Sequence, residues 1–189
     1  ILKEKFPHLK IGGYASCGFY ALDDGGTTFA NSSPRYAYFM EFFDGFMDYI
    51  AEHQCPLDFF SWHSYGNIPH TMNYARYARE RLDAAGYTDT EHTCNEWNCC
   101  PNLYGTVQHA AYTAGMLLAM QDSSLDSAMF YDARCGVSIY GIFNPLTKEP
   151  FPTYYDFIGF GQLYRRGTQV ESSCDEEKVY AVAAAGEEG

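Results

Sequence analysis

The feature of this sequence that most constrains its fold is an alternation of short apolar runs with longer stretches of helical periodicity. This alternation is typical of βα units, which build a parallel sheet. The apolar runs predict strands over residues 9–12, 57–63, 91–96 and 127–131. The periodic stretches predict helices over residues 36–53, 73–85, 106–121 and 153–165. We therefore expect an α/β fold made of four consecutive units.

The spacing of the predicted strand ends favours one parallel-sheet architecture over another. The last three ends fall near residues 63, 96 and 131, so the last two steps are 33 and 35 residues long. A (β/α)8 TIM barrel averages roughly 31 residues per unit. A doubly wound sheet stays an alternative, but no G-x-G-x-x-G follows any of the predicted strands. Four units amount to half a barrel.

The two ends of the chain suggest that it is cut from a longer one. It begins at Ile1, with neither Met nor the charged-then-apolar pattern of a signal peptide. Residues 178–185 form an apolar run that predicts a strand, and no partner strand follows it. Half a barrel also leaves open sheet edges and an apolar inner face, so we expect this piece to self-associate or to depend on absent chain.

The charge balance restricts the partners. The 24 acidic residues against 12 basic ones give a net charge of −12, which repels phosphate backbones and anionic lipid. We therefore expect neither nucleic acid nor a membrane as partner. No stretch approaches the roughly 20 apolar residues of a membrane-spanning helix.

The chain has seven cysteines, an odd number without the regular spacing of a disulfide framework. Reduced thiols are the simpler interpretation, and they favour the cytoplasm, although the location stays open. His92, Cys94, Cys99 and Cys100 lie close in sequence, which leaves a Cys/His metal protein as an alternative. Zinc sites, however, use two matched ligand pairs, and this cluster offers no second pair. We expect no metal and no cofactor.

Polar side chains gather where the predicted strands end, which is where barrel enzymes carry their working residues. Glu96 is the sharpest candidate, because a carboxylate closing an apolar strand has little structural reason to be there. The alternative is a solvated loop acid. His63 could hold that carboxylate or a sugar hydroxyl, or be a half-buried side chain with no such role. Asp132 and Arg134 are expected to pair with each other.

Aromatic residues at the same strand ends could stack on sugar rings, whose C–H faces are apolar. Core packing is the alternative for any aromatic in a chain with 17 Tyr and 14 Phe. The residues concerned are Trp62, Tyr65, Trp97 and Tyr131.

Four segments carry a resemblance to a known family: residues 9–13, 56–65, 95–98 and 152–157. Together they resemble the second half of a family 39 glycoside hydrolase, a family that includes β-xylosidases and α-L-iduronidases. The resemblance implies a retaining clan A (β/α)8 glycosidase of which strands five to eight are present. It places Glu96 as the nucleophile on strand seven, and His63 with Tyr65 along the −1 subsite. Asn95 joins them as a substrate-binding residue.

The resemblance also implies what this chain lacks. The acid/base of such enzymes ends strand four, and that segment is absent, so the piece alone is expected to be inactive. Glu91 cannot replace it, because five residues of strand put it about 16 Å from Glu96. Residues 1–167 are expected to form the half-barrel, and residues 168–189 the start of an appended β-sandwich.

The implied substrate is an oligosaccharide or glycoside, with a xyloside favoured. Two alternatives remain. Residues 95–98 also resemble the corresponding segment of family 51 arabinofuranosidases, and a noncatalytic carbohydrate-binding relative would share the same fold.

Overall fold

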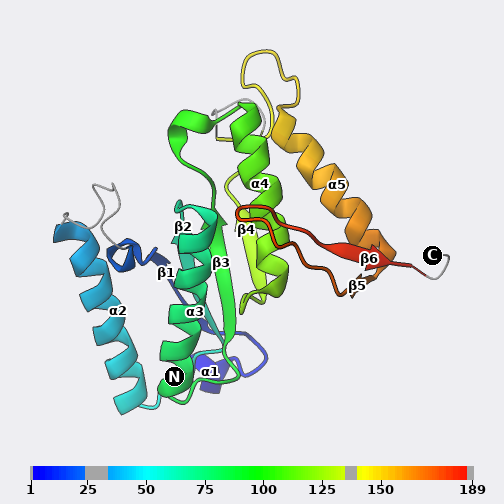
Figure 1. Cartoon of the computed structure of the whole chain (residues 1–189). Helices are drawn as coiled ribbons and strands as arrows, with labels where there is room; N and C mark the ends of the chain where they lie inside the picture. The colour runs from blue at the N-terminus through cyan, green and yellow to red at the C-terminus, as the bar shows by residue number, and fades with distance from the viewer. Residues whose placement is uncertain (1, 24–33, 135–139, 187–189) are drawn as a thin grey trace. The chain divides into compact units, whose positions relative to one another are not determined.

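The computed structural model describes residues 2–23, 34–134 and 140–186 (Figure 1). The chain forms two compact units. The first unit comprises Ile1–Trp97 and Ser124–Met129, and the second unit comprises Asn98–Ser123 and Phe130–Gly189. None of the helices in the described ranges is long and apolar enough to cross a membrane.

The sheet has the four strands and the strand order that the sequence predicts. Its strands are β1 (Gly12–Cys17), β2 (Phe59–Ser64), β3 (Glu91–Trp97) and β4 (Ser127–Phe130), and they lie side by side in chain order (Figure 1). β1 pairs with β2 and β2 with β3 in parallel. Consecutive order is what a (β/α)8 barrel requires of neighbouring units. The barrel itself stays a prediction.

The first strand begins at Gly12, three residues later than predicted. Residues 9–12 are apolar enough to indicate a strand, but the strand pairing with β2 begins at Gly12, opposite Phe59. A Cβ atom at Gly12 would lie 1.9 Å from the Phe59 carbonyl oxygen, so the absence of a side chain permits this pairing. Close backbone approach is a common reason for glycine in a strand.

Four long helices follow close to the predicted ranges: α2 (Pro34–Glu52), α3 (Ile68–Ala84), α4 (Val107–Ala119) and α5 (Pro152–Arg166). Short elements complete the set: α1 (Leu2–Lys5), η1 (Tyr20–Leu22), η2 (Pro101–Leu103) and η3 (Met120–Asp122). α3 starts five residues before the predicted residue 73, because the Asn67 side chain caps it by accepting a hydrogen bond from the His70 backbone N–H. Thr106 caps α4 in the same way through the His109 N–H.

The core of the first unit lies between the sheet and α2 and α3. Phe60 and Trp62, two residues apart on β2, are both fully buried and point to the same face. Phe43 of α2 packs against Phe60 with ring centroids 5.2 Å apart, and Tyr74 of α3 packs against Trp62 at 6.3 Å. In the first unit, therefore, α2 and α3 cover the face of the sheet that carries Phe60 and Trp62. The residues that alternate with them on β2, such as Ser61 and His63, lie on the opposite face.

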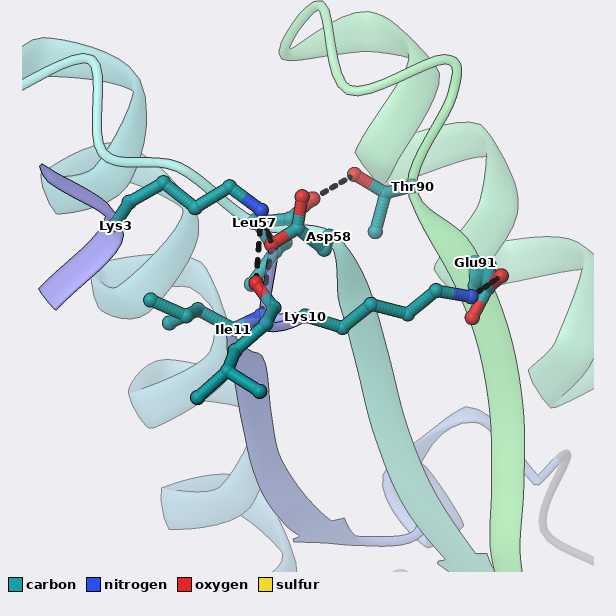
Figure 2. Close-up of polar contacts among 8 residues, drawn as sticks. Lys3, Lys10, Ile11, Leu57, Asp58, Thr90 and Glu91 are labelled. Carbon is teal, nitrogen blue, oxygen red and sulfur yellow. Dashed lines mark hydrogen bonds and ion pairs between the residues drawn. The ribbon is translucent and has the colours of Figure 1, made fainter. Parts of the chain in front are cut away.

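Polar contacts tie together the starting ends of the first three strands. Figure 2 shows them among Lys3, Lys10, Ile11, Leu57, Asp58, Thr90 and Glu91. Asp58 accepts hydrogen bonds from Lys3 Nζ and from the Ile11 backbone N–H, each at 2.7 Å, and these contacts lower its pKa. Lys10 pairs with Glu91. Glu91 thus lies at the opposite end of β3 from Glu96, as expected.

The second unit is built on α4 and α5, which pack against each other. The Phe130 ring contacts both His109 and Phe157. β5 (Thr168–Val170) and β6 (Ala183–Ala185) form an antiparallel pair. The predicted strand over residues 178–185 is therefore shorter than expected, and its partner precedes it in the chain. The β-sandwich stays a prediction.

Candidate active site

Three of the predicted site residues meet at the carboxyl end of the sheet. The Glu96 side chain is 27% exposed, and its Oε1 accepts a hydrogen bond of 2.5 Å from the Tyr65 hydroxyl. His63 Nδ1 lies 3.7 Å from the same oxygen, and the His63 side chain is 21% exposed. Charge-assisted hydrogen bonds of this kind hold a carboxylate in one orientation. The result is a half-buried, oriented carboxylate with a histidine beside it.

A β-bulge in β3 brings Glu96 to His63. β2 and β3 pair in regular register up to Trp62 with Cys94, whereas the next pair joins His63 to Glu96. Asn95 is therefore one residue extra. Strict alternation would point Glu96 to the helix-covered face, together with Cys94. The bulge resets the alternation and puts Glu96 on the face of His63.

A matching irregularity lies in β1. Tyr14 pairs with Ser61 and Ser16 with Trp62, so Ala15 is extra there. Ala15 has φ 64°, and its backbone N–H donates to the Ser61 hydroxyl at 3.1 Å. The two strands that flank β2 thus both carry a bulge near the end at which Glu96 lies.

The structure does not bring the two tryptophans to this site. Trp62 is 0% exposed and Trp97 is 1% exposed, so neither presents a ring face to a ligand. The reason for Trp62 is the alternation of the strand, since it precedes His63 and points to the helices. Its indole N–H donates to His92 Nε2 at 2.7 Å. Trp62 and Trp97 are both buried side chains, so neither is available for the predicted stacking on sugar rings.

The remaining predicted residues have other surroundings. The Asn95 side-chain oxygen is buried with no hydrogen-bond partner among the described residues. Tyr131 belongs to the second unit, where its hydroxyl accepts a hydrogen bond from Arg134 Nη2 at 3.3 Å. Arg134 also donates to Asp132 at 2.5 Å, which confirms the expected pair. Asp132 is thus engaged as a structural partner of Arg134.

His92 and Cys94 of the Cys/His cluster take part in ordinary hydrogen bonds. His92 uses both ring nitrogens, Nε2 toward Trp62 and Nδ1 toward the Ser124 carbonyl at 3.2 Å, and burial lowers its pKa to about 4. Cys94 donates to the Glu96 carbonyl, and burial raises its pKa to about 12. Within residues 2–23, 34–134 and 140–186, no three His, Cys, Asp or Glu side chains are grouped to hold a metal.

Sequence reasoning missed Tyr20, which lies in the connection after β1. Its hydroxyl accepts a hydrogen bond of 3.0 Å from the backbone N–H of Tyr65. The only sequence signal is the glycine at position 18, two residues earlier. In the structure the backbone of Gly18 adopts φ +26°. A tyrosine in a long connection is otherwise indistinguishable from the other aromatic residues of this chain.

A hollow of about 500 Å³ lies in the second unit, beside α5, β5 and β6. Phe160, Leu163 and Val182 contribute its apolar walls, and its described lining contains no carboxylate. The described lining therefore lacks the pair of carboxyl groups that most glycoside hydrolases use.

Comparison with known proteins yields solved structures only, since no family model and no curated protein matches the chain. A glucosidase from Croceicoccus marinus matches with a TM-score of 0.71 and 25% identity, over 99% of this chain and 39% of its own. A GH39 β-xylosidase from Caulobacter crescentus matches with a TM-score of 0.59 and 18% identity, over 85% of this chain and 34% of its own. A monomeric β-xylosidase from the same organism gives a TM-score of 0.59 at 15% identity, over 85% and 35%.

The chain thus spans well under half the length of each of these glycosidases. Its own four strands lie in the order that the sequence predicts, and the similarity extends over nearly all of it. In fold, the chain resembles part of a family 39 type glycoside hydrolase, as the sequence motifs indicated.

Proposed function

We propose that this chain is the half of a (β/α)8 glycosidase that carries the nucleophile, and that the nucleophile is Glu96. One observation carries the proposal: a bulge at Asn95 turns Glu96 onto the face of His63, where Tyr65 orients its carboxylate. A merely solvated acid would need neither the bulge nor the hydrogen bond. Bulges are over-represented next to active sites because they re-aim a side chain.

The proposed reaction is hydrolysis of an O-glycosidic bond with retention. A carboxylate oxygen of Glu96 attacks the anomeric carbon while the bond to the leaving oxygen breaks, and that oxygen takes a proton from a second carboxyl group. The same group then removes a proton from water, which displaces Glu96 and releases the sugar. Tyr65 fixes the carboxylate during both steps, and His63 is placed to contact a sugar hydroxyl or Glu96.

The second carboxyl group must lie about 5 to 5.5 Å from the nucleophile in a retaining enzyme. Glu91 is at the other end of β3 with Lys10, and Asp132 is paired with Arg134. We therefore assign the acid/base to a part of the enzyme outside this chain, on strand four of the barrel. The short coverage of the similar glycosidases supports this assignment.

A xyloside is the favoured substrate, because two of the similar structures are described as β-xylosidases. The third is described as a glucosidase, so an aryl β-glucoside belongs in the same assay. Tyr65 and His63 are the side chains of this chain that we expect to meet the sugar.

The test uses the full-length protein that contains this chain. Glu96→Gln keeps the shape of the side chain but removes the attacking charge, so kcat should fall by roughly 10⁴ or more with little change in substrate binding. Glu91→Gln is the matched control on the same strand and should leave kcat unchanged. A 2-fluoro glycoside should label Glu96.

Two results would overturn the proposal. Label on Asp132, or near-normal turnover by Glu96→Gln, would remove Glu96 from the reaction. Sugar binding without hydrolysis by the unmodified protein would favour a noncatalytic carbohydrate-binding relative.

A further inference from the structure

Tyr65 is held at both ends. Its hydroxyl donates to Glu96, and its backbone N–H donates to the Tyr20 hydroxyl at 3.0 Å. Tyr65 follows the last residue of β2 and precedes α3, outside both elements. The Tyr20 contact therefore fixes the backbone of a residue whose side chain reaches 2.5 Å from the carboxylate.

Tyr20 itself is fixed by α3. Its ring packs edge-on against Tyr74 with centroids 5.8 Å apart and planes at 89°. The Tyr74 hydroxyl donates to Asp23 at 2.5 Å, and His70 Nδ1 lies 3.2 Å from the other carboxylate oxygen. Asp23 is buried at the end of η1, the short turn that contains Tyr20. α3 therefore contacts this turn at two places, the Tyr20 ring and the Asp23 carboxylate.

Gly18 makes the arrangement sterically possible. A Cβ atom there would lie 2.7 Å from the Tyr20 ring and 2.9 Å from the His63 carbonyl oxygen. Both distances are far below van der Waals contact, so the Tyr20 ring and the end of β2 close on the bare glycine backbone. The turn is consequently pressed against the strand that presents His63.

We propose that Tyr20 is a positioning residue for the reaction, acting through the backbone of Tyr65 on the orientation of Glu96. Asp23 and Tyr74 hold Tyr20 in place, and Gly18 admits it. This inference rests on the proposed function, since it assigns no contact between Tyr20 and the substrate. A displacement of about 1 Å at a reacting group is enough to cost catalysis.

The test is Tyr20→Phe in the full-length protein, which removes the accepting oxygen and keeps the ring against Tyr74. Loss of one backbone hydrogen bond should lower kcat about tenfold while KM changes less than about twofold. Tyr77→Phe is the matched control, because the Tyr77 ring packs on Phe19 and Phe43 in the same core. Tyr77→Phe should leave kcat unchanged.

A double variant separates positioning from a general structural effect. If Tyr20 acts through Tyr65, then Tyr20→Phe should cost almost nothing further in a Tyr65→Phe background. Multiplicative losses in the double variant, or an unchanged kcat in Tyr20→Phe, would overturn the inference. In both cases a large loss in Glu96→Gln would leave the proposed function standing, so the two failures are distinguishable.

Discussion

The buried pair of Trp62 and His92 predicts a loss of stability in mild acid. His92 accepts the Trp62 indole N–H, and an imidazolium cannot accept it. Burial is the largest cause of the lowered pKa, Arg79 adds to it, and Asp126 opposes it. The folded value of about 4 lies below the ordinary 6.5, so the unfolded state binds more protons between these values. The contribution of His92 to the free energy of unfolding is therefore fully present above pH 6.5 and is lost as the pH drops toward 4.

The size of the effect follows from the two pKa values. At pH 5 the linkage relation gives a loss of about 2 kcal/mol relative to pH 7. Hydrogen exchange measured by mass spectrometry on peptides covering β2 and β3 reports this opening directly. After correction for intrinsic rates, exchange should be about 30-fold faster at pH 5 for openings that expose His92.

The variant His92→Gln supplies the decisive comparison. Glutamine can still accept the Trp62 hydrogen bond through its side-chain oxygen but does not titrate, so the acceleration at pH 5 should largely disappear. His53→Gln alters an exposed histidine just after α2, and this variant should still show the acceleration of exchange at pH 5. An acceleration that persists in His92→Gln would refute the reasoning.

Two further predictions concern the site and the sheet. His63→Ala in the full-length protein should lower kcat by about 10- to 10³-fold, less than Glu96→Gln, because the nucleophile remains; an equal or larger loss would contradict a supporting role. Gly12→Ala should destabilise the first unit by about 3 kcal/mol, seen as a drop in melting temperature, because its Cβ would meet the Phe59 carbonyl. Gly45→Ala, whose Cβ meets nothing within 4 Å inside α2, is the matched control and should be neutral or stabilising.

Local sequence patterns predicted the elements of this fold well, because hydrophobic period and caps act over a few residues. Three of the four strands and the long helices lie close to their predicted ranges, and Glu96 and His63 come together as expected. The start of β1 was wrong because it depends on a close approach to β2, some 47 residues away in sequence. Such a contact leaves no local signal except the glycine itself.

The predicted site was less accurate where alternation decides which face a residue occupies. Trp62 and His63 were both proposed for the site, although neighbours in a strand point to opposite faces. Applied to β3, the same rule would have excluded Glu96, because only the bulge at Asn95 puts its side chain on the face of His63. A bulge is a property of the pairing between two strands, and periodicity within one strand does not reveal it.

The bulge makes Asn95 a residue that β3 could lose without changing the face on which Glu96 lies. Deleting Asn95 would restore continuous pairing and leave the strand's core-facing residues up to Cys94 where they are. The same deletion would put Glu96 directly after Cys94 and opposite His63, so regular alternation alone would keep its carboxylate on the face of His63. Among proteins that share this fold, a strand shorter by this one residue is therefore compatible with an intact nucleophile, whereas a regular strand that kept Asn95 without a bulge would turn Glu96 toward the helices.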